Sequence, residues 1–175
     1  MEPITDLEEI RRLAVERHAE FELLRLQLQR RDKLDDAKLD AHVDQVAAPI
    51  IAAIDCKQCA NCCRSLDVYL VEDDASRLAE GLLIPLAEIE TRYVDPAAEV
   101  EEWGKLRQRP CVFLKGNLCS VYQHRPESCR VYPAFTPDFR WTLEDTIEGA
   151  SLCPIIYNVL VALCDQLLGK PNLRA

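Results

Sequence analysis

The chain has 175 residues and a formal net charge of −9. This length suits one domain, or one domain with an arm, and an acidic chain is a poor general binder of nucleic acid. No stretch approaches the roughly 18 uncharged apolar residues of a membrane span, and the acidic N-terminus lacks the basic-then-apolar order of a secretory signal. We therefore expect a cytoplasmic protein that binds neither nucleic acid nor membrane. In that reducing setting, the nine cysteines favour metal binding or catalysis over disulfides.

Residues 1–48 predict a helical arm. Thr5 and Glu8 have the spacing of a capping box, which places the start of the first helix there. The apolar residues that follow recur close to a heptad pattern, at Leu7, Ile10, Ala14, Phe21, Leu24 and Leu28. Such a stripe is typical of a partner-binding coiled coil, of a helical hairpin or of packing against the chain's own domain. We favour the last two, because the repeat is short and Arg17 and Arg31 occupy seam positions.

Residues 49–175 predict a cysteine-cluster metal-binding domain that ends in a helix. A second helical stretch, interrupted by Pro49, leads into the cysteines, and a short strand is expected over residues 66–71. We expect further helices from Asp73 or Asp74 to Gly81, from 85 to 93, in a polar stretch containing Trp103, and over the apolar residues 154–168. A hairpin with the three-residue loop 115–117 joins residues 111–114 to 118–122. The predicted fold class is mainly α with one or two short β-hairpins, a small metal-stabilised domain with an N-terminal helical arm.

The densest signal is a C-x2-C-x2-C-C run formed by Cys56, Cys59, Cys62 and Cys63. Thiolates at C-x2-C spacing allow one short loop to place two sulfurs about 3.5–4 Å apart on one metal ion, with Zn–S bonds of roughly 2.3 Å. Consecutive residues usually project in different directions. Cys62 and Cys63 are therefore expected to serve two neighbouring centres, or to be a ligand and a bystander.

Four more cysteines stand where a chain presents ligands. Cys111 and Cys119 lie on the two arms of the predicted hairpin, and Cys129 follows a proline at a tight turn or first helical turn. Cys153 precedes a helix start, where backbone N–H groups and the helix dipole stabilise a thiolate. With the first run these make eight candidate ligands, enough for two four-thiolate centres. Eight cysteines are sufficient for two such centres but do not require two.

The ninth cysteine and the three histidines are expected not to bind metal. Cys164 lies inside the apolar C-terminal helix and is assigned to packing. His18 and His42 are interpreted as solvent-facing, and His124 as a solvated turn residue. The donor set suits tetrahedral zinc, and it also suits iron, because C-x2-C-x2-C with a distant Cys-Pro is the local form of 4Fe–4S ligation. The sequence leaves zinc and an iron–sulfur centre open.

Cations gather near the later cysteines. Between Trp103 and Pro133, a single acid, Glu127, accompanies Lys105, Arg107, Arg109, Lys115, Arg125 and Arg130. Arg64 directly follows the first cysteine run. We interpret these cations as balancing thiolates and orienting ligands; a site for an anionic partner is the alternative.

The combined pattern resembles the YkgJ-type cysteine-cluster proteins, a family described as zinc- or iron-chelating. The resemblance covers roughly residues 50–155, through Cys56-x2-Cys59-x2-Cys62-Cys63-Arg64, Cys111-Val-Phe-Leu114, Gly116-x2-Cys119-x2-Tyr122 and Arg125-Pro126-x2-Cys129-Arg130-x-Tyr132-Pro133. The family often has glycine after the second cysteine, where this chain has Ala60. The same signature occurs in flagellin lysine-N-methylases, which implies an enzymatic relative. The five glycines here are isolated and form no G-x-G-type loop.

Three functional hypotheses follow. The first is a metal-binding protein that holds zinc or an iron–sulfur centre, with no catalytic residue identified. The second is an iron–sulfur enzyme or electron-transfer protein. The third is an interaction module whose helical arm binds a protein partner.

Overall fold

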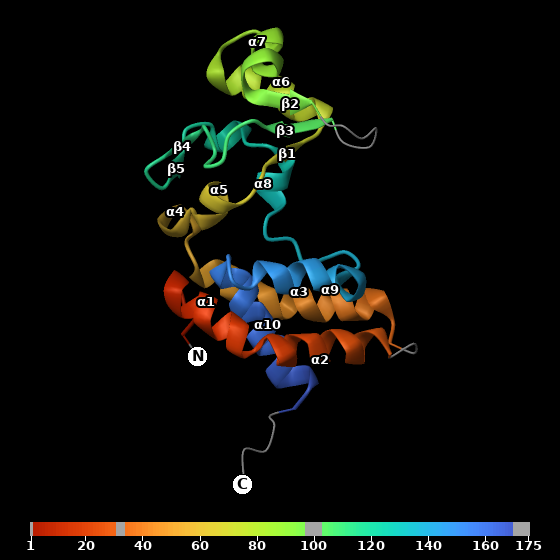
Figure 1. Ribbon diagram of the computed structural model, residues 1–175. Coiled ribbons are helices and arrows are strands. Elements are labelled where there is room, and N and C mark those ends of the chain that lie inside the picture. The colour runs from red at the N-terminus through yellow and green to blue at the C-terminus, as the bar shows by residue number, and fades with distance from the viewer. Residues whose placement is uncertain (1, 31–33, 97–102, 170–175) are drawn as a thin grey trace. The chain divides into compact units, whose positions relative to one another are not determined.

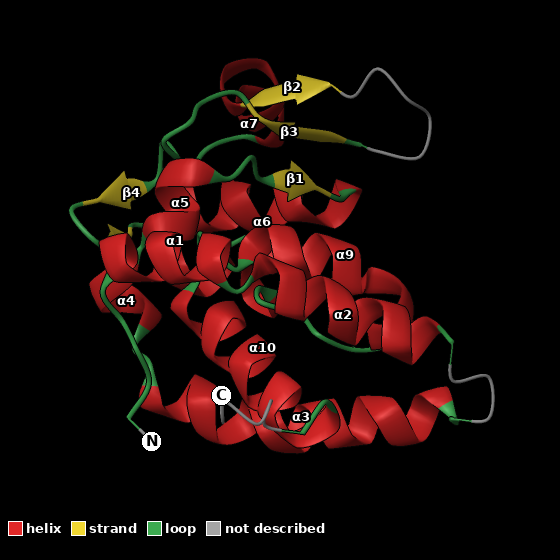
Figure 2. Ribbon diagram, turned by 60° about the horizontal axis from the view of Figure 1, so that its bottom comes forward, coloured by secondary structure: helices red, strands yellow, loops and turns green. Residues whose placement is uncertain are grey.

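The computed structural model describes residues 2–30, 34–96 and 103–169. The chain divides into two compact units: a helical unit, made of Met1–Asp55 and Pro133–Ala175, and a cysteine unit, Cys56–Tyr132. Helices dominate the described residues and the strands are short and antiparallel, which confirms the predicted fold class (Figure 1). Figure 2 shows the same predominance of helix over strand. No helix within the described ranges has the length and apolar character of a membrane span.

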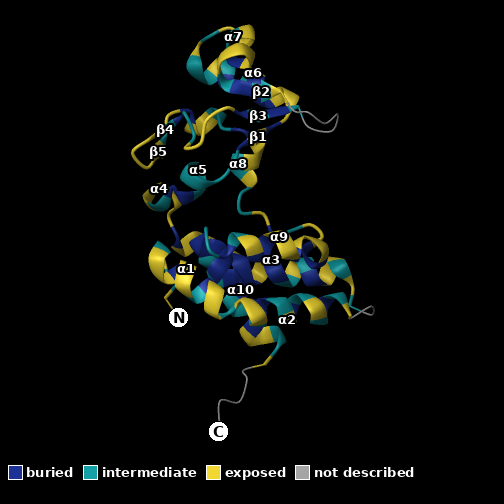
Figure 3. Cartoon of the chain, viewed as in Figure 1, coloured by how far each residue is buried: buried dark blue, intermediate teal, exposed yellow. Residues whose placement is uncertain are grey.

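The helical unit is built around its last helix. It contains α1 (Leu7–Glu16), α2 (His18–Gln29), α3 (Asp36–Ala53), α9 (Phe139–Gly149) and α10 (Pro154–Leu167). Helix α10 packs against the other four, and Figure 3 shows dark blue, the colour of buried residues, along much of it. The apolar stripe of the arm is buried in the same unit at Ile10, Ala14, Phe21, Leu24 and Leu28. The stripe therefore packs inside its own chain, as we favoured, and the structure explains its pattern without a partner.

Two aspartates start helices in this unit. Asp6 caps α1 by accepting a 2.8 Å hydrogen bond from the Glu9 amide, and Asp35 caps α3 through the Lys38 amide at 3.0 Å. The predicted cap at Thr5 is wrong by one residue, because the carboxylate of Asp6 is the group that reaches the first-turn amides. Pro49 lies inside α3, which runs on to Ala53.

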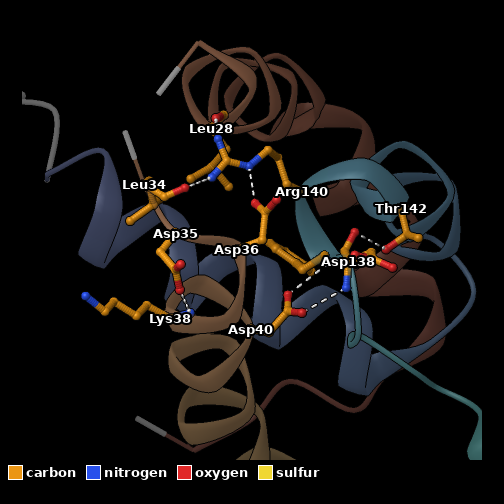
Figure 4. A network of polar contacts seen from close by, with 10 residues as sticks. Leu28, Leu34, Asp35, Asp36, Lys38, Asp40, Asp138, Arg140 and Thr142 are labelled. Carbon is orange, nitrogen blue, oxygen red and sulfur yellow. Dashed lines mark hydrogen bonds and ion pairs between the residues drawn. The ribbon is translucent and has the colours of Figure 1, made fainter. Parts of the chain in front are cut away.

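Helix α9, which the sequence pattern does not predict, is held by buried polar contacts (Figure 4). The guanidinium of Arg140 is only 4% exposed; it donates to Asp36 at 2.6 Å and to the carbonyl of Leu28 at 2.7 Å. One turn further along α3, the carboxylate of Asp40 accepts from the amides of Asp138 and Phe139 at 2.8 and 3.0 Å. A side chain of α3 therefore caps α9 from outside that helix.

The cysteine unit has shorter elements around a small core. It contains α4 (Cys56–Cys59), α5 (Asn61–Ser65), β1 (Tyr69–Leu70), α6 (Glu72–Leu82), α7 (Leu86–Tyr93), β2 (Val94–Pro96), β3 (Gly104–Leu106), β4 (Leu114–Lys115), β5 (Leu118–Cys119), the 3-10 turn η1 (Tyr122–His124) and α8 (Glu127–Val131). One antiparallel sheet has the order β1-β3-β2, and β4 pairs with β5. The buried core consists of Val68, Leu70, Ala75, Leu78, Ile89, Val94, Leu106, Phe113 and Val121.

The hairpin is confirmed, with a shorter turn than predicted. Lys115 pairs with Leu118, so that only Gly116 and Asn117 form the turn. Gly116 has φ of +63°, a left-handed conformation that glycine adopts at little cost.

Two other local predictions in this unit are corrected. Helix α6 continues through Gly81 to Leu82, because Gly81 is a packing position, where a Cβ would meet the His124 side chain at 2.8 Å. Asp95 and Pro96 belong to β2 and pair with β3. Trp103 lies just before β3 and outside any helix; the rest of the polar helix predicted there falls on residues 97–102, outside the described residues.

Candidate metal centre

The first cysteine run forms two short helices separated by one left-handed residue. Helix α4 ends at Cys59, Ala60 adopts φ 49° and ψ 21°, and α5 begins at Asn61. The left-handed conformation costs an L-residue roughly 1–2 kcal/mol, and glycine avoids that cost. The position where the family often has glycine therefore has positive φ in this chain too, although Ala60 occupies it. This break reverses the chain between the second and third cysteines.

Cys62 and Cys63 point their sulfurs to the same place. The two Sγ atoms lie 4.0 Å apart, although the residues are consecutive in α5. Two thiolates on one tetrahedral ion, with metal–sulfur bonds of roughly 2.3 Å, lie about 3.5–4 Å apart. The expectation that adjacent cysteines project apart is therefore wrong for these sulfur atoms. Their separation is compatible with two ligands of a single ion.

The hairpin and its flanks bring two later cysteines to the same region. The amide of Cys111 donates to the carbonyl of Cys63 at 2.8 Å, joining the approach to the hairpin directly to α5. Cys119 lies in β5 opposite Leu114. Both cysteines pack against the buried core of the unit. Their thiols are consequently half-buried rather than solvated.

Helix α8 places Cys129 by polar contacts at its first turn. The amide of Glu127 donates to the buried carboxylate of Asp74 at 2.9 Å, and the hydroxyl of Ser128 donates to the carbonyl of Tyr69 at 2.7 Å. Asp74 also accepts from the amide of Val71, which closes the start of α6. These contacts attach α8 to β1 and α6. Cys129 is thereby fixed against the same core as Cys111 and Cys119.

The thiols of this group influence one another's ionisation. Burial, and then the negative charges that Cys111, Cys63 and Cys119 would carry, raise the pKa of Cys129 to about 12. Burial likewise raises the pKa of Cys111 and of Cys119, and Cys63 contributes to both shifts. The four thiols therefore share one neighbourhood in which several negative charges repel one another. A bound cation would reverse this repulsion.

Cys63 has the opposite shift. A hydrogen bond from Cys62 and the positive charges of Arg64 and Arg125 lower the pKa of Cys63 to about 6, against the opposing effect of burial. One thiol of the group is thus prepared as a thiolate near neutral pH. A thiolate is the form that binds metal.

Arg125 faces this group with an unused donor. Its guanidinium stacks over the ring of Tyr122, 3.9 Å from the centroid. Among the described residues, the buried Nε of Arg125 has no hydrogen-bond partner. A buried donor without an acceptor is costly, and a buried cation is usually balanced by negative charge. The free thiols and this orphaned Nε together fit a thiolate-ligated metal centre, whose ligands carry the negative charge that Arg125 lacks.

Most other cations of the unit are already paired. Lys105 and Arg109 contact Asp67 at 3.0 and 3.7 Å, Arg107 contacts Asp95 at 3.3 Å, and Arg130 contacts Glu127 at 3.9 Å. Asp67 and Asp95 lie outside residues 103–133, the stretch in which cations outnumber acids. The apparent excess of positive charge is thus largely neutralised. This pairing favours the structural interpretation of these cations over a general anion-binding face.

The remaining predicted ligands lie in different settings. Cys56 is exposed and Cys59 half-buried at the two ends of α4. Cys153 is buried in the helical unit, where it caps α10 and its amide donates to the carbonyl of Gly149. Cys164 is buried in the core of that unit, 3.9 Å from the carbonyl of Glu20. Within the described ranges, no three Cys, His, Asp or Glu side chains already form a metal-holding group.

The sequence pattern did not reveal two residues that organise this site. The sequence pattern predicts only a helix start at Asp73 or Asp74, whereas the carboxylate of Asp74 also accepts from the amide at the start of α8. The sequence pattern predicts only a turn position for Asn117, whereas its side chain donates a hydrogen bond to the carbonyl of Gln58 in the first cysteine run. The sequence does place Asn117 beside Gly116 in a hairpin that carries a predicted ligand. Asparagine and glycine are common together in turns, so this pattern by itself does not predict the contact with the first cysteine run.

These features define a class: a small domain in which cysteine thiols from several short elements gather near an arginine whose Nε is buried. The model of the CxxCxxCC family, described as "Putative zinc- or iron-chelating domain", matches residues 55–154, more than half of the chain. The chain belongs to this family of metal-chelating, cysteine-rich domains. No curated protein and no solved structure matches it.

Proposed function

We propose that the protein is a cytoplasmic metal-binding protein whose cysteine unit holds a zinc ion or an iron centre through thiolates. Cys63, Cys111, Cys119 and Cys129 are the central ligands, and Cys62 lies close enough to Cys63 to join them. Cys56, Cys59 and Cys153 complete the proposed ligand set on the grounds of sequence. The assignment to YkgJ-type proteins, rather than to the wider family, is part of the same proposal.

The observation that carries this proposal is the approach of the cysteine segments: the Sγ atoms of Cys62 and Cys63 lie 4.0 Å apart, and the amide of Cys111 donates to the carbonyl of Cys63 at 2.8 Å. The orphaned Nε of Arg125, whose charge acts on Cys63, supports it. A structure that needed these cysteines only for packing would have no reason to leave a guanidinium donor unsatisfied beside them. Arg125 is near enough to lower the pKa of Cys63, and Cys129 is partly buried against the core of the unit. A bound ion would supply the positive charge and connect three segments of the chain.

The test is metal analysis of the full chain purified without oxygen. Brown absorbance with stoichiometric iron and sulfide would assign an iron–sulfur centre, which is the form required by an electron-transfer or enzymatic role. Colourless protein with near-integral zinc would assign a closed structural site. Failure to retain or take up either metal after reconstitution with zinc, or with iron and sulfide, would overturn the proposal.

Single substitutions locate the ligands. Cys63→Ser and Cys129→Ser are expected to lower metal content severely, because each removes a thiolate from the central group. Cys164→Ser is the control, since it removes a thiol that is more deeply buried and lies in the helical unit. An equal loss of metal from Cys164→Ser would contradict this ligand assignment.

A further inference from the structure

Arg64 joins the first cysteine run to the tip of the hairpin. Its Nη1 donates to the carbonyl of Cys59 at 2.8 Å, and its Nη2 donates to the carbonyl of Gly116 at 2.9 Å. The same Nη2 contacts the Oδ1 of Asn117. A planar guanidinium with several fixed donors can serve three acceptors at once, and the point charge of lysine cannot reproduce that geometry. Arg64 therefore does more than supply positive charge.

Asn117 returns the contact. Its Nδ2 donates to the carbonyl of Gln58 at 2.7 Å, while its Oδ1 accepts from Arg64. The residues joined in this way lie 52 to 59 positions apart in the chain. Gln58 and Cys59 belong to α4, whereas Gly116 and Asn117 form the turn just before Cys119. Two segments that carry proposed ligands are thus connected by hydrogen bonds.

The acceptors explain why this connection concerns the metal centre. Two of the acceptors are the main-chain carbonyls of Cys59, a proposed ligand, and of Gln58, which precedes it. Fixing the backbone of one residue costs roughly 1–2 kcal/mol of conformational entropy, which must be met when the ligands assemble. Contacts that order these segments in advance remove part of that cost from the binding step, as preorganisation does in other binding sites.

We propose that Arg64 and Asn117 form a clamp that holds the first cysteine run against the β4–β5 hairpin before metal binds. The clamp makes both residues positioning residues of the metal centre, and its effect on metal affinity rests on the function proposed above. The existence of the clamp in the metal-free chain does not rest on the proposed function.

The clamp itself is tested on the metal-free full chain by hydrogen exchange. In Arg64→Lys and in Asn117→Ala, amides of residues 58–66 and 114–119 are expected to exchange faster, while those of α10 keep their protection. Arg109→Lys is the matched control, because Arg109 is an exposed arginine of the same unit whose contact with the Ser65 carbonyl is 3.5 Å. Unchanged exchange in both clamp variants would overturn the proposal.

The consequence for the metal is measured by competition with a chromophoric chelator, with cobalt(II) and zinc(II) as probes. Arg64→Lys is expected to weaken binding about tenfold, the lower end of the effect of residues that orient metal ligands. The absorption spectrum of the cobalt-saturated protein should stay that of the unsubstituted chain, since the ligands are unchanged. Arg109→Lys should stay within about twofold, as expected for an exposed pair.

Asn117→Asp sharpens the assignment. Aspartate keeps the acceptor for Arg64 and loses only the donor to Gln58, so its effect should fall between those of the unsubstituted chain and Asn117→Ala. Because the two residues act together, combining Arg64→Lys with Asn117→Ala should cost less than the sum of the single effects. Additive effects, or a loss of affinity as large in Arg109→Lys, would contradict the clamp. If the unsubstituted chain binds no metal, the proposed function fails, and hydrogen exchange still decides the clamp.

Discussion

The two units of the molecule achieve order by different means. In the helical unit, four helices pack against α10, the core consists of aliphatic and aromatic side chains, and the buried Arg140 donates to Asp36 and to main-chain carbonyls. The cysteine unit has elements as short as two residues, a smaller apolar core and thiols packed against it. Small cores commonly need a covalent or metal cross-link to be stable. Most thiols of the cysteine unit are partly buried around a small core, whereas Cys164 lies fully buried within a larger one.

The largest expected effect is metal removal, which should separate the two units. Extraction with a strong chelator, or Cys129→Ser, is expected to abolish hydrogen-exchange protection in residues 56–132 and leave α10 protected. Structural zinc sites contribute on the order of 10 kcal/mol of apparent binding free energy, far more than a small core can replace. Segment-resolved hydrogen exchange measures this. Loss of protection in both units together would show that they fold as one.

The reverse experiment breaks the helical unit and spares the other. Arg140→Met leaves the buried carbonyl of Leu28 without this donor, whereas the half-exposed carboxylate of Asp36 can turn to water. The free energy of unfolding should therefore fall by about 1–3 kcal/mol. Urea denaturation measures the loss, and metal content should not change. The control is Arg12→Met, because Arg12 and Glu16 form an exposed pair on α1 that is worth about 0.5 kcal/mol or less. Equal effects from the two substitutions would show that the buried network does not stabilise α9.

The pH dependence of metal binding sharpens the role of Cys63. Its folded pKa of about 6 lies below the free-thiol value of 9.0, so its contribution to the stability of the metal-free chain is complete above pH 9 and is lost as the pH falls through 6. Cys129 behaves oppositely: with a pKa of about 12, its contribution is present below pH 9 and is lost as the pH rises through 12.

Between pH 6 and 9, an ion held by these two thiolates, Cys111 and Cys119 should therefore release about three protons rather than four. Calorimetry in buffers of different ionisation enthalpy counts them. Arg125→Gln removes a charge that lowers the pKa of Cys63, so near pH 6.5 the count should rise toward four. A count of four already in the unsubstituted chain would show that Cys63 is not prepared as a thiolate.

The smallest expected effect concerns the bend between the second and third cysteines. Ala60→Gly should stabilise the metal-loaded protein by about 0.5–1 kcal/mol, because relief of the left-handed conformation exceeds the entropy that glycine loses on folding. Ala60→Val should destabilise it by about 1–3 kcal/mol, since a branched residue is strained there. Urea midpoints compare the variants. The opposite order would mean that the bend at Ala60 is not needed for the ligand loop.

Local patterns predicted the elements with strong local signals. The apolar C-terminal helix begins at Pro154 as expected, and the hairpin lies at Gly116, although its turn is one residue shorter. Helix α9 escaped prediction because Asp40, on another helix, satisfies its first amides. Polar residues such as Arg140 also interrupt its apolar face, and their partners are distant in sequence. A cap or an ion pair supplied from elsewhere leaves no local pattern to recognise.

The residue types alone account for the donor chemistry of the site, because donor type is a property of each side chain: clustered thiols are suited to zinc or iron. The sequence by itself also determined the helical periodicity, which depends on neighbours three and four residues away. Long-range packing brings the segments that carry Cys63, Cys111, Cys119 and Cys129 into one neighbourhood, and it leaves the Nε of Arg125 without a hydrogen-bond partner among the described residues. Those facts depend on contacts between residues some fifty positions apart, where packing rather than spacing sets the distance.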